Sequence, residues 1–386
     1  MIKKKKKGKK TLWIFAAASF LNDMGADMIY PLWPFFLTTV LGAPMAVLGF
    51  IDGLGDALVS LSQAFSGYLS DRLRRRKVFI WLGYLFGSFS RIGYAFSPTW
   101  KVIIPFRVLD RSGKIRDAPR DAMIADMSTS ETRGAAFGIL QTFDNFGAVT
   151  GIFLSLILFP IFGYRDLFLF ASLPSIIAVL LILLFIKKRQ KTDIKIYKGF
   201  TFKELSRDFR YFLFVSAIFA LGSFSYSFLL IFSGKMGFRV ASIPLLYLVF
   251  TFMASISSFP FGKLADRIGR KKVIFVSYFL WMLTILSFIF LSGITGLIVS
   301  FILYGLHKGG LETVQKAFAS ELAPVEFRAS GLGTFKMVIG LFALPASFLA
   351  GILWDRVSIF APFYFSLFVT VLSGILFVFM REKNKN

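Results

Sequence analysis

The sequence GYLSDRLRRRK at residues 67–77 returns as GKLADRIGRKK at residues 262–272. The aspartates of the two copies, Asp71 and Asp266, are 195 residues apart in a chain of 386 residues. Each copy is a short, strongly basic stretch that follows a long hydrophobic segment. An internal repeat at about half the chain length indicates a duplicated architecture.

A second pair of stretches repeats with the same spacing. Asp126 and Glu321 each follow a small residue and are again 195 residues apart. An arginine stands seven residues after each of them, at Arg133 and at Arg328. Two independent pairs at one spacing predict two homologous halves of equal length, a layout found in many membrane transporters.

The composition is that of a membrane protein. Hydrophobic residues make up 56% of the chain, and hydrophobic runs follow one another from Thr11 to Met380 with short polar breaks. As a helix, a run of roughly 18 apolar residues crosses the hydrocarbon core of a bilayer. We therefore predict an all-α membrane protein with twelve transmembrane helices in two pseudo-symmetric six-helix halves. The expected spans are 11–40, 45–70, 77–97, 101–126, 134–160, 165–187, 209–234, 243–263, 272–292, 295–321, 329–353 and 359–380.

The basic residues predict the orientation in the membrane. The chain carries 45 Lys and Arg against 21 Asp and Glu. With the N-terminus inside, the cytoplasmic segments would hold about 30 Lys and Arg and the opposite loops about five. Both termini are therefore expected in the cytoplasm, in a multi-pass protein of the plasma (inner) membrane. The two halves are expected at residues 1–187 and 209–386, joined by a cytoplasmic linker at 188–208.

Charge distribution and missing motifs exclude several classes of protein. A net charge of +24 is typical of nucleic-acid-binding proteins, but here the basic residues lie in loops between hydrophobic segments, so we expect no nucleic acid partner. The chain has no cysteine, no recognisable phosphate-binding loop and no catalytic constellation. We expect neither an enzyme nor a bound cofactor or metal. Transport would then be driven by an ion gradient or by the gradient of the solute itself.

The repeated loop, Gly-x-x-x-Asp-Arg-x-Gly-Arg-Lys-Lys in general form, resembles the signature of the major facilitator superfamily. The second copy fits it fully, whereas Arg74 replaces the usual glycine in the first, so a differently shaped turn is expected there. The resemblance covers the whole chain. It implies two six-helix halves that rock around a central site, with helices 1, 4, 7 and 10 lining the cavity.

Two further stretches resemble a narrower group of prokaryotic permeases, whose members mostly have no assigned substrate. They are NDMGADMIYP at residues 22–31 and RVLDRSGKIRDAPRDA at residues 107–122. The superfamily's antiporter signature is only partly present, because Gly147 and Gly151 have the spacing of its small residues but its proline is missing. A drug antiporter therefore does not follow from the resemblance.

Charged residues inside the spans are the best candidates for a site, because such groups are costly in a bilayer. The span expected at 101–126 carries charges three or four residues apart, which would share one face of a continuous helix. Its candidate residues are Arg107, Asp110, Arg111, Lys114, Asp117 and Asp121. They form either a ladder of structural ion pairs or the lining of a cavity that binds an ionic solute or relays protons. Pro119 is expected to break the hydrogen bonding of this helix.

Two carboxylates on the first span are candidates for proton coupling. Asp23 and Asp27 are one helical turn apart, and Tyr30 follows them. Like charges at this spacing repel in a low dielectric, so one carboxylate is expected to hold a proton. Asp27 is preferred because it lies deeper in the membrane. The alternative is that a cation of the 101–126 span neutralises each carboxylate, and we expect Asp27 within reach of such a cation.

The second half offers fewer charged candidates. Those proposed for its side of the cavity are Tyr226, Lys308 and Glu312. His307 is the only histidine, and we expect it to be a hydrogen-bonded structural residue. Asp52, in the second span, is expected to have a packing role against helix 4 or 11.

The repeated basic loops are expected to form a cytoplasmic gate. By symmetry, Asp71 should approach the helix that begins near Arg328, and Asp266 the helix that begins near Arg133. A carboxylate at a helix N-terminus gains roughly 0.3–1 kcal/mol from the helix dipole. The proposed gate residues are Asp71, Arg72, Asp126, Arg133, Asp266, Arg267, Glu321 and Arg328.

These features predict a secondary active transporter that works by alternating access, with proton-coupled efflux of a small solute as the first hypothesis. Proton-coupled uptake of an organic anion competes with it, because Arg107, Arg111 and Lys114 supply positive charge. A lipid translocase, or a membrane protein that transports nothing, is a further alternative. The expected partners are the solute, protons and membrane lipids, and the protein is expected to be monomeric.

Overall fold

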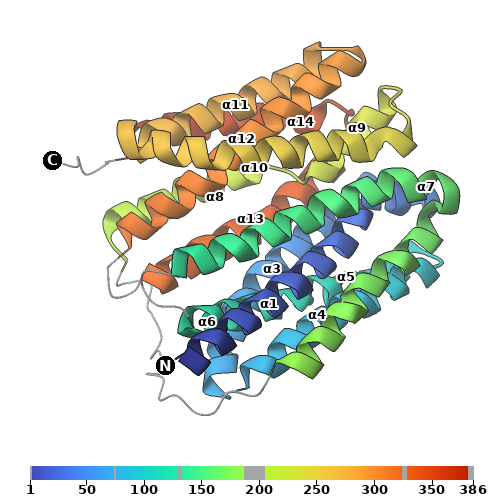
Figure 1. The fold of residues 1–386 in the computed structure, drawn as a ribbon. Coiled ribbons are helices and arrows are strands. Elements are labelled where there is room, and N and C mark those ends of the chain that lie inside the picture. Colours follow the sequence, from blue (N-terminus) through green and yellow to red (C-terminus); the bar gives the residue numbers. More distant parts are fainter. Residues whose placement is uncertain (1, 74, 128–132, 187–204, 324–327, 381–386) are drawn as a thin grey trace. The chain divides into compact units, whose positions relative to one another are not determined.

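The computed structural model describes residues 2–73, 75–127, 133–186, 205–323 and 328–380 (Figure 1). Within these ranges every regular element is a helix. Helices suit a bilayer because each backbone N–H and C=O group finds its partner inside the same segment. The helices group into six spans in each half of the chain, which confirms the prediction of an all-α protein with twelve spans.

The first half contains six spans, some of which are interrupted. They are α1 (Ile2–Ile29) followed by the short α2 (Trp33–Phe35) and the π-helical turn η1 (Phe36–Val40); α3 (Met45–Arg72); α4 (Arg76–Phe96); α5 (Trp100–Ser112), the 3-10 turn η2 (Gly113–Arg116) and α6 (Asp117–Met127); and α7 (Arg133–Phe185). Two spans lie within α7 and meet at Gly163, whose backbone has φ 69° and ψ −166°. Glycine adopts this conformation without steric cost.

The second half has the same plan. It consists of α8 (Arg207–Gly222) and α9 (Tyr226–Lys235), the 3-10 turn η4 (Val240–Ser242), α10 (Ile243–Ile268), α11 (Arg270–Phe290), α12 (Gly293–Leu322), α13 (Arg328–Arg356) and α14 (Ala361–Val378). Ser206 begins α8 as an N-cap, since its side chain accepts a hydrogen bond from the Phe209 N–H at 3.1 Å.

Three predicted spans are not the continuous helices that the sequence suggested. The span expected at 11–40 is interrupted between α1, which ends at Ile29, and α2, which begins at Trp33. The span expected at 101–126 is interrupted by the 3-10 turn η2, and we call the whole segment α5–η2–α6 the broken span. The span expected at 209–234 is interrupted between α8 and α9. There Ser225 restarts the helix, because its side chain accepts a hydrogen bond from the Ser227 N–H.

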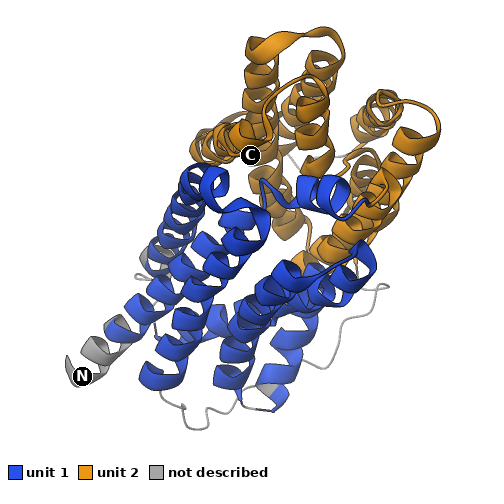
Figure 2. Ribbon diagram, turned by 90° about the vertical axis from the view of Figure 1, so that its right-hand side faces the viewer, with its two compact units in different colours: residues 1–42, 58–198 blue, residues 43–57, 199–386 orange. Residues whose placement is uncertain are grey.

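The chain divides into two compact units (Figure 2). The first consists of residues 1–42 and 58–198, and the second of residues 43–57 and 199–386. The division therefore passes through α3, whose first turns belong to the second unit. The glycines of these turns allow very close packing: a Cβ atom at Gly49 would lie 2.0 Å from the Ser347 carbonyl oxygen.

The start of α3 is also held by a side chain of α13. The carboxylate of Asp355 accepts hydrogen bonds from the backbone N–H groups of Met45 and Ala46, at 3.1 and 2.8 Å. The first N–H groups of a helix have no partner within the helix. Asp355 satisfies two of them and places negative charge at the positive end of the helix dipole.

Two glycines of α7, four residues apart, let this helix pack closely on α1. A Cβ atom at Gly147 would lie 2.4 Å from the carbonyl oxygen of Phe20, and one at Gly151 would lie 2.1 Å from that of Met24. Small residues four apart let two helix backbones approach in a membrane. The glycines of the partial antiporter signature therefore have a structural role here.

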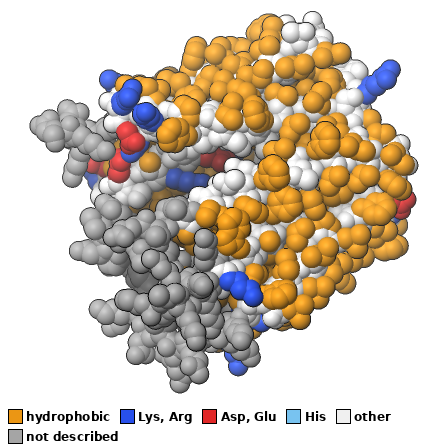
Figure 3. Space-filling model, in the orientation of Figure 1, with side chains coloured by type: hydrophobic (Ala, Val, Ile, Leu, Met, Phe, Trp, Pro, Cys, Tyr) orange, Lys and Arg blue, Asp and Glu red, His pale blue; other side chains and the backbone are white. Residues whose placement is uncertain are grey.

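Hydrophobic side chains cover most of the face drawn in Figure 3. Large side chains such as Phe259 and Phe290 are 77% and 75% exposed, which suits contact with lipid tails. Eight of the described helices are long and apolar enough to cross a membrane. The spans outside that set are α1, α4 and the broken span, and these three carry the charged side chains of the site below.

Candidate functional site

The broken span packs closely on α4 at its 3-10 turn. A Cβ atom at Gly83 would lie 2.4 Å from the Gly113 carbonyl oxygen, so the two backbones touch. Beside this contact the chain makes the 3-10 turn η2, and the Arg116 side chain donates to the Gly113 carbonyl at 3.0 Å. The charges that were expected on one stripe of a continuous helix are therefore carried by two helices, α5 and α6, and by the turn between them. Pro119, which was expected to break the hydrogen bonding of this helix, lies in the first turn of α6 directly after η2, where its missing N–H group is not needed.

The α5 part of the broken span carries two arginines that pack on aromatic rings. The Arg107 guanidinium lies 4.3 Å from the centre of the Trp33 ring, and its side chain is almost fully buried. Arg111 lies over the ring of Tyr30 at 5.0 Å and donates to its hydroxyl at 3.4 Å. Asp110 is close to both cations, with its Oδ2 atom 3.8 Å from Arg107 and 4.0 Å from Arg111. Cation–π contacts and the carboxylate together make these buried charges tolerable.

Three cations surround Asp117 at the start of α6. Its carboxylate lies 3.9 Å from Lys114, 3.7 Å from Arg116 and 3.8 Å from Arg120. Gln63 of α3 also donates to it at 3.0 Å. Asp117 is therefore the centre of a network that ties the broken span to α3.

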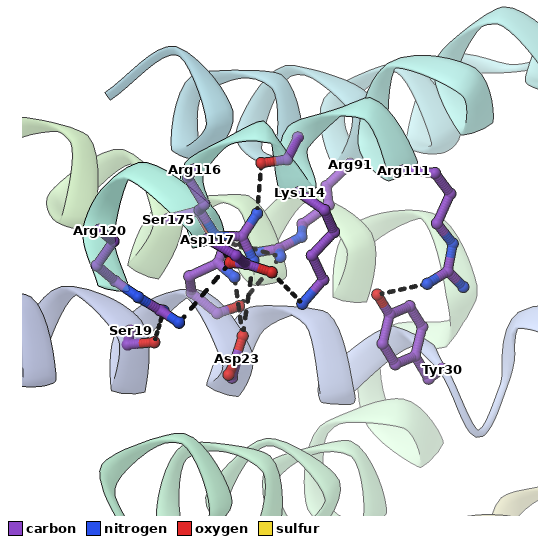
Figure 4. A network of polar contacts seen from close by, with 12 residues as sticks. Ser19, Asp23, Tyr30, Arg91, Arg111, Lys114, Arg116, Asp117, Arg120 and Ser175 are labelled. Atoms are coloured by element: carbon purple, nitrogen blue, oxygen red, sulfur yellow. Dashed lines mark hydrogen bonds and ion pairs between the residues drawn. The ribbon is translucent and has the colours of Figure 1, made fainter. Parts of the chain in front are cut away.

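Arg120 extends this network to the first helix. It donates to Ser19 of α1 at 2.8 Å (Figure 4). It also donates to Asp121 at 3.1 Å. Asp121 is more exposed than the other carboxylates of the broken span, with 43% of its side chain accessible. It therefore lies at the edge of the network.

The first helix contributes the carboxylates. Asp23 accepts a hydrogen bond from Asn22 at 2.9 Å and lies 3.9 Å from the Nη2 atom of Arg116. Asp27, one turn further on, lines the same cavity as Arg111 and Lys114. Asp23 thus forms an ion pair between α1 and the broken span.

Arg91 of α4 is one of the residues that the sequence analysis missed, together with Arg116 and Arg120 of the broken span. It is 2% exposed and donates to the backbone carbonyls of Asn22 and Ala171, both at 3.0 Å. It also donates to the hydroxyl of Ser175, which in turn donates to the Asn22 side chain at 3.1 Å. The signal that could have identified it is the presence of an arginine inside the apolar run 77–97, because a charged residue at membrane depth is costly. Arg91 joins α1, α4 and the second span of α7.

These side chains enclose a cavity of about 130 Å³ in the first unit. Figure 4 shows Lys114, Arg116 and Asp117 converging on α1 around Asp23. The lining residues are Asn22, Asp23, Ala26, Asp27, Tyr30, Gly87, Arg91, Asp110, Arg111, Lys114 and Arg116. Among the described residues, no group of three His, Cys, Asp or Glu side chains could hold a metal ion.

The site residues expected in the second half lie in the second unit, and their place in the transport cavity stays a prediction. Lys308 and Glu312 form an ion pair of 3.4 Å on α12, and both side chains are more than a third exposed. The Tyr226 ring lies 5.3 Å from that of Tyr247. His307 is fully enclosed, and its Nδ1 atom lies 2.7 Å from the Ser277 carbonyl oxygen, as a structural histidine would be placed.

A buried carboxylate marks the interruption of the seventh span. Asp52 of α3 is 4% exposed and accepts hydrogen bonds from the hydroxyls of Ser225 and Ser227, at the start of α9. The packing role expected for Asp52 was against helix 4 or 11, whereas these partners belong to helix 7. Its hydrogen bonds place α3 against the point where α8 gives way to α9.

The basic loops contain ion pairs within each half. Asp126 pairs with Arg76 at 2.7 Å, and Glu321 pairs with Arg270 at 3.1 Å. Arg270 also contacts Asp266 at 2.5 Å. The side chains of Arg72 and Arg267 are exposed. The side chains of Asp71, Arg133 and Arg328 fall outside the described residues, so the pairs expected between the halves stay predictions.

The helix that follows the first basic loop begins one residue later than its counterpart in the second half. From Asp71 to the first residue of α4 the chain advances five residues, and from Asp266 to the first residue of α11 it advances four. Gly269 begins the shorter turn with φ 101°, a conformation that glycine adopts without strain. The first loop begins its helix from Arg75 with φ −124°. The spacing of 195 residues is the same before and after the loops, so the two loops differ in where the next helix begins and not in chain length.

The comparisons with known proteins cover nearly the whole chain. The family model of the Major Facilitator Superfamily matches residues 15–254 and, in a second match, residues 211–386. The MFS-type transporter MJ1317 of Methanocaldococcus jannaschii is 35% identical over 383 residues, which cover 96% of this chain and 95% of that relative. The multi-drug resistance efflux pump PmrA of Streptococcus pneumoniae is 28% identical over 79% of each chain.

A solved structure shows the same fold. A variant of the nucleoside transporter NupG superposes with a TM-score of 0.80 at 15% sequence identity, covering 96% of this chain and 100% of the other. Because the family model accounts for both halves of the repeat, this multi-pass membrane protein belongs to the major facilitator superfamily.

Proposed function

We propose that this protein is a proton-coupled secondary transporter that works by alternating access and exports a small solute. The observation that supports it best is the cavity of the first unit, where Asp23 and Asp27 share a polar space with four cations. Ionisable groups at membrane depth mark ion and solute pathways. The efflux pump PmrA among the relatives supports export as the direction.

In the proposed alternating-access cycle, the parts that move are the halves 1–187 and 209–386, which are joined by the linker 188–208. We place the protein in the inner membrane as a monomer, with both termini in the cytoplasm. The excess of Lys and Arg in the loops on the side of the termini supports this orientation.

A second candidate function is proton-coupled uptake of an organic anion. Four of the residues that line the cavity are cations and three are carboxylates, so the lining has an excess of positive charge. Binding a solute of opposite charge would balance this excess.

Transport in proteoliposomes tests the proposed function. With an imposed pH gradient and a panel of organic cations, nucleosides and organic anions, at least one solute should accumulate against its own gradient. A protonophore should abolish the accumulation, and adding the solute should move protons, as followed by an internal pH dye. A solute that only equilibrates, at a rate independent of the pH gradient, would contradict proton coupling.

The gate is a separate part of the proposal. The double variants Asp71→Cys with Arg328→Cys and Asp266→Cys with Arg133→Cys should cross-link when the cytoplasmic side is closed. Disulfides need Cα atoms within about 7 Å, and the chain has no cysteine of its own to interfere. Mass analysis after mild oxidation measures the cross-link, with each single variant as control. If neither pair cross-links with or without solute and pH gradient, these residues do not form the gate.

A further inference from the structure

We propose that the cavity of the first unit is a binding site for a small oxyanion, the anionic group of the transported solute, and that Arg116 is its principal ligand. The inference rests on the proposed transport function and adds the chemical class of the solute.

The charge of the lining favours an anion. Arg91, Arg111, Lys114 and Arg116 contribute four positive charges, and the carboxylates of Asp23, Asp27 and Asp110 contribute three negative ones. An unbalanced charge at membrane depth is costly unless a counter-charge neutralises it. A monoanion in the cavity would make the lining neutral.

The hydrogen bonding of Arg116 is more direct evidence that the ligand is an oxyanion. Its side chain is 5% exposed, and its Nη1 atom donates to the Gly113 carbonyl of its own turn. The Nε atom is buried and has no hydrogen-bond partner in the structure. The nearest carboxylate oxygens are those of Asp117, 3.7 Å from Nε, and Asp23, 3.9 Å from Nη2. Both distances exceed that of a hydrogen bond.

Nε and Nη2 are the two parallel donors with which an arginine holds a carboxylate or phosphate in bidentate fashion. In this structure that edge of Arg116 lies between two carboxylates without hydrogen-bonding either. A buried donor left unsatisfied costs free energy that an incoming oxyanion would recover. Arg116 is therefore placed to exchange its loose ion pairs for a solute.

Other lining residues would complete the site. Lys114 offers a mobile ammonium group with about a third of its side chain exposed, and the Tyr30 hydroxyl already interacts with Arg111. The cavity of about 130 Å³ has room for a carboxylate or phosphate group.

Equilibrium binding to the full-length protein in nanodiscs of neutral lipid tests the inference. The probes are radiolabelled benzoate and inorganic phosphate, with tetraphenylphosphonium as the probe of opposite charge. We expect at least one anion to bind and Arg116→Gln to weaken it at least tenfold. Arg116→Lys should have an intermediate effect, because it keeps the charge and loses the two parallel donors. The matched control is Arg76→Gln, which removes an arginine that pairs with Asp126 outside the lining.

Asp23→Asn separates a binding role from a structural one. If Asp23 competes with the solute for Arg116, removing its charge should tighten anion binding severalfold, whereas loss of a merely structural ion pair would not. Unchanged or weaker binding in Asp23→Asn, or equal loss in Arg116→Gln and Arg76→Gln, would overturn the proposal. Repeating the assay with phosphatidylglycerol in the nanodisc identifies the source of the anion: if the lipid displaces the soluble probes, the site belongs to a lipid headgroup and the solute assignment is wrong.

The proposed transport function and the proposed anion site are contradicted by different results. A protein that binds neither anion but moves another solute in a proton-coupled manner keeps the transport function and loses the anion site. A protein that binds an anion at Arg116 but carries no solute across the membrane keeps the site and loses the transport function.

Discussion

Replacing Asp27 by asparagine should reduce pH-gradient-driven transport at least tenfold while leaving solute binding and solute exchange intact. Asp27 lines the charged cavity together with Asp23 and the cations Arg111 and Lys114. A proton carrier must bind and release its proton as the cavity opens to each side in turn. Asparagine has the size of the protonated carboxyl group but cannot release a proton, so the coupled cycle stops. Initial rates of uphill transport and of counterflow, measured in the same liposomes, check the result.

The control for Asp27→Asn is Asp208→Asn, because Asp208 lies in the first turn of α8 and is absent from the cavity lining. If Asp27 has only a structural role, the variant should misfold, since removing one partner of a buried charge pair is strongly destabilising. Gel filtration and thermal unfolding in detergent distinguish this case. A well-folded Asp27→Asn protein that still concentrates solute with the wild-type pH dependence would remove Asp27 from proton coupling.

Replacing Arg91 by leucine should destabilise the protein by roughly 3–5 kcal/mol, the usual cost of removing one partner from a buried charged network. Arg91 is 2% exposed and holds together two backbone carbonyls and the Asn22–Ser175 pair. Leucine would remove the hydrogen bonds that Arg91 donates to these acceptors, and a hydrogen bond that involves a charged group contributes about 1.5–3 kcal/mol. A large fall in Tm, or loss of the monodisperse gel-filtration peak in detergent, is the expected measurement.

Two comparisons sharpen the Arg91 prediction. Arg91→Lys keeps the charge but cannot reach all the acceptors, so its Tm should lie between those of the wild type and Arg91→Leu. Lys101→Leu, an exposed cation near the start of α5, should leave Tm within a few degrees of the wild type. If Arg91→Leu unfolds at the wild-type temperature, the hydrogen bonds of Arg91 do not hold the first unit together.

The sequence by itself determined the architecture, because repeats and hydrophobic length are properties of the linear chain. Asp71 and Asp266 revealed the duplication, and the apolar runs gave twelve spans, since a bilayer sets the length of any helix that crosses it. The quoted stretch 107–122 also contained most of the charged residues of the site. Their presence within a span was enough to predict a polar interior.

Tertiary structure decided how those charges are arranged. The broken span is interrupted where Gly113 contacts Gly83 of α4. The periodicity of one helix could not predict this contact, because it depends on the backbone of a neighbouring helix. Arg91 could not be placed from the sequence for the same reason. It is a single arginine in an apolar run, and its hydrogen-bond acceptors belong to α1 and α7. Periodicity tells which residues share a face of one helix. Only the packing of several helices decides which charge meets which, because those partners are distant in sequence and their attraction depends on separation and burial.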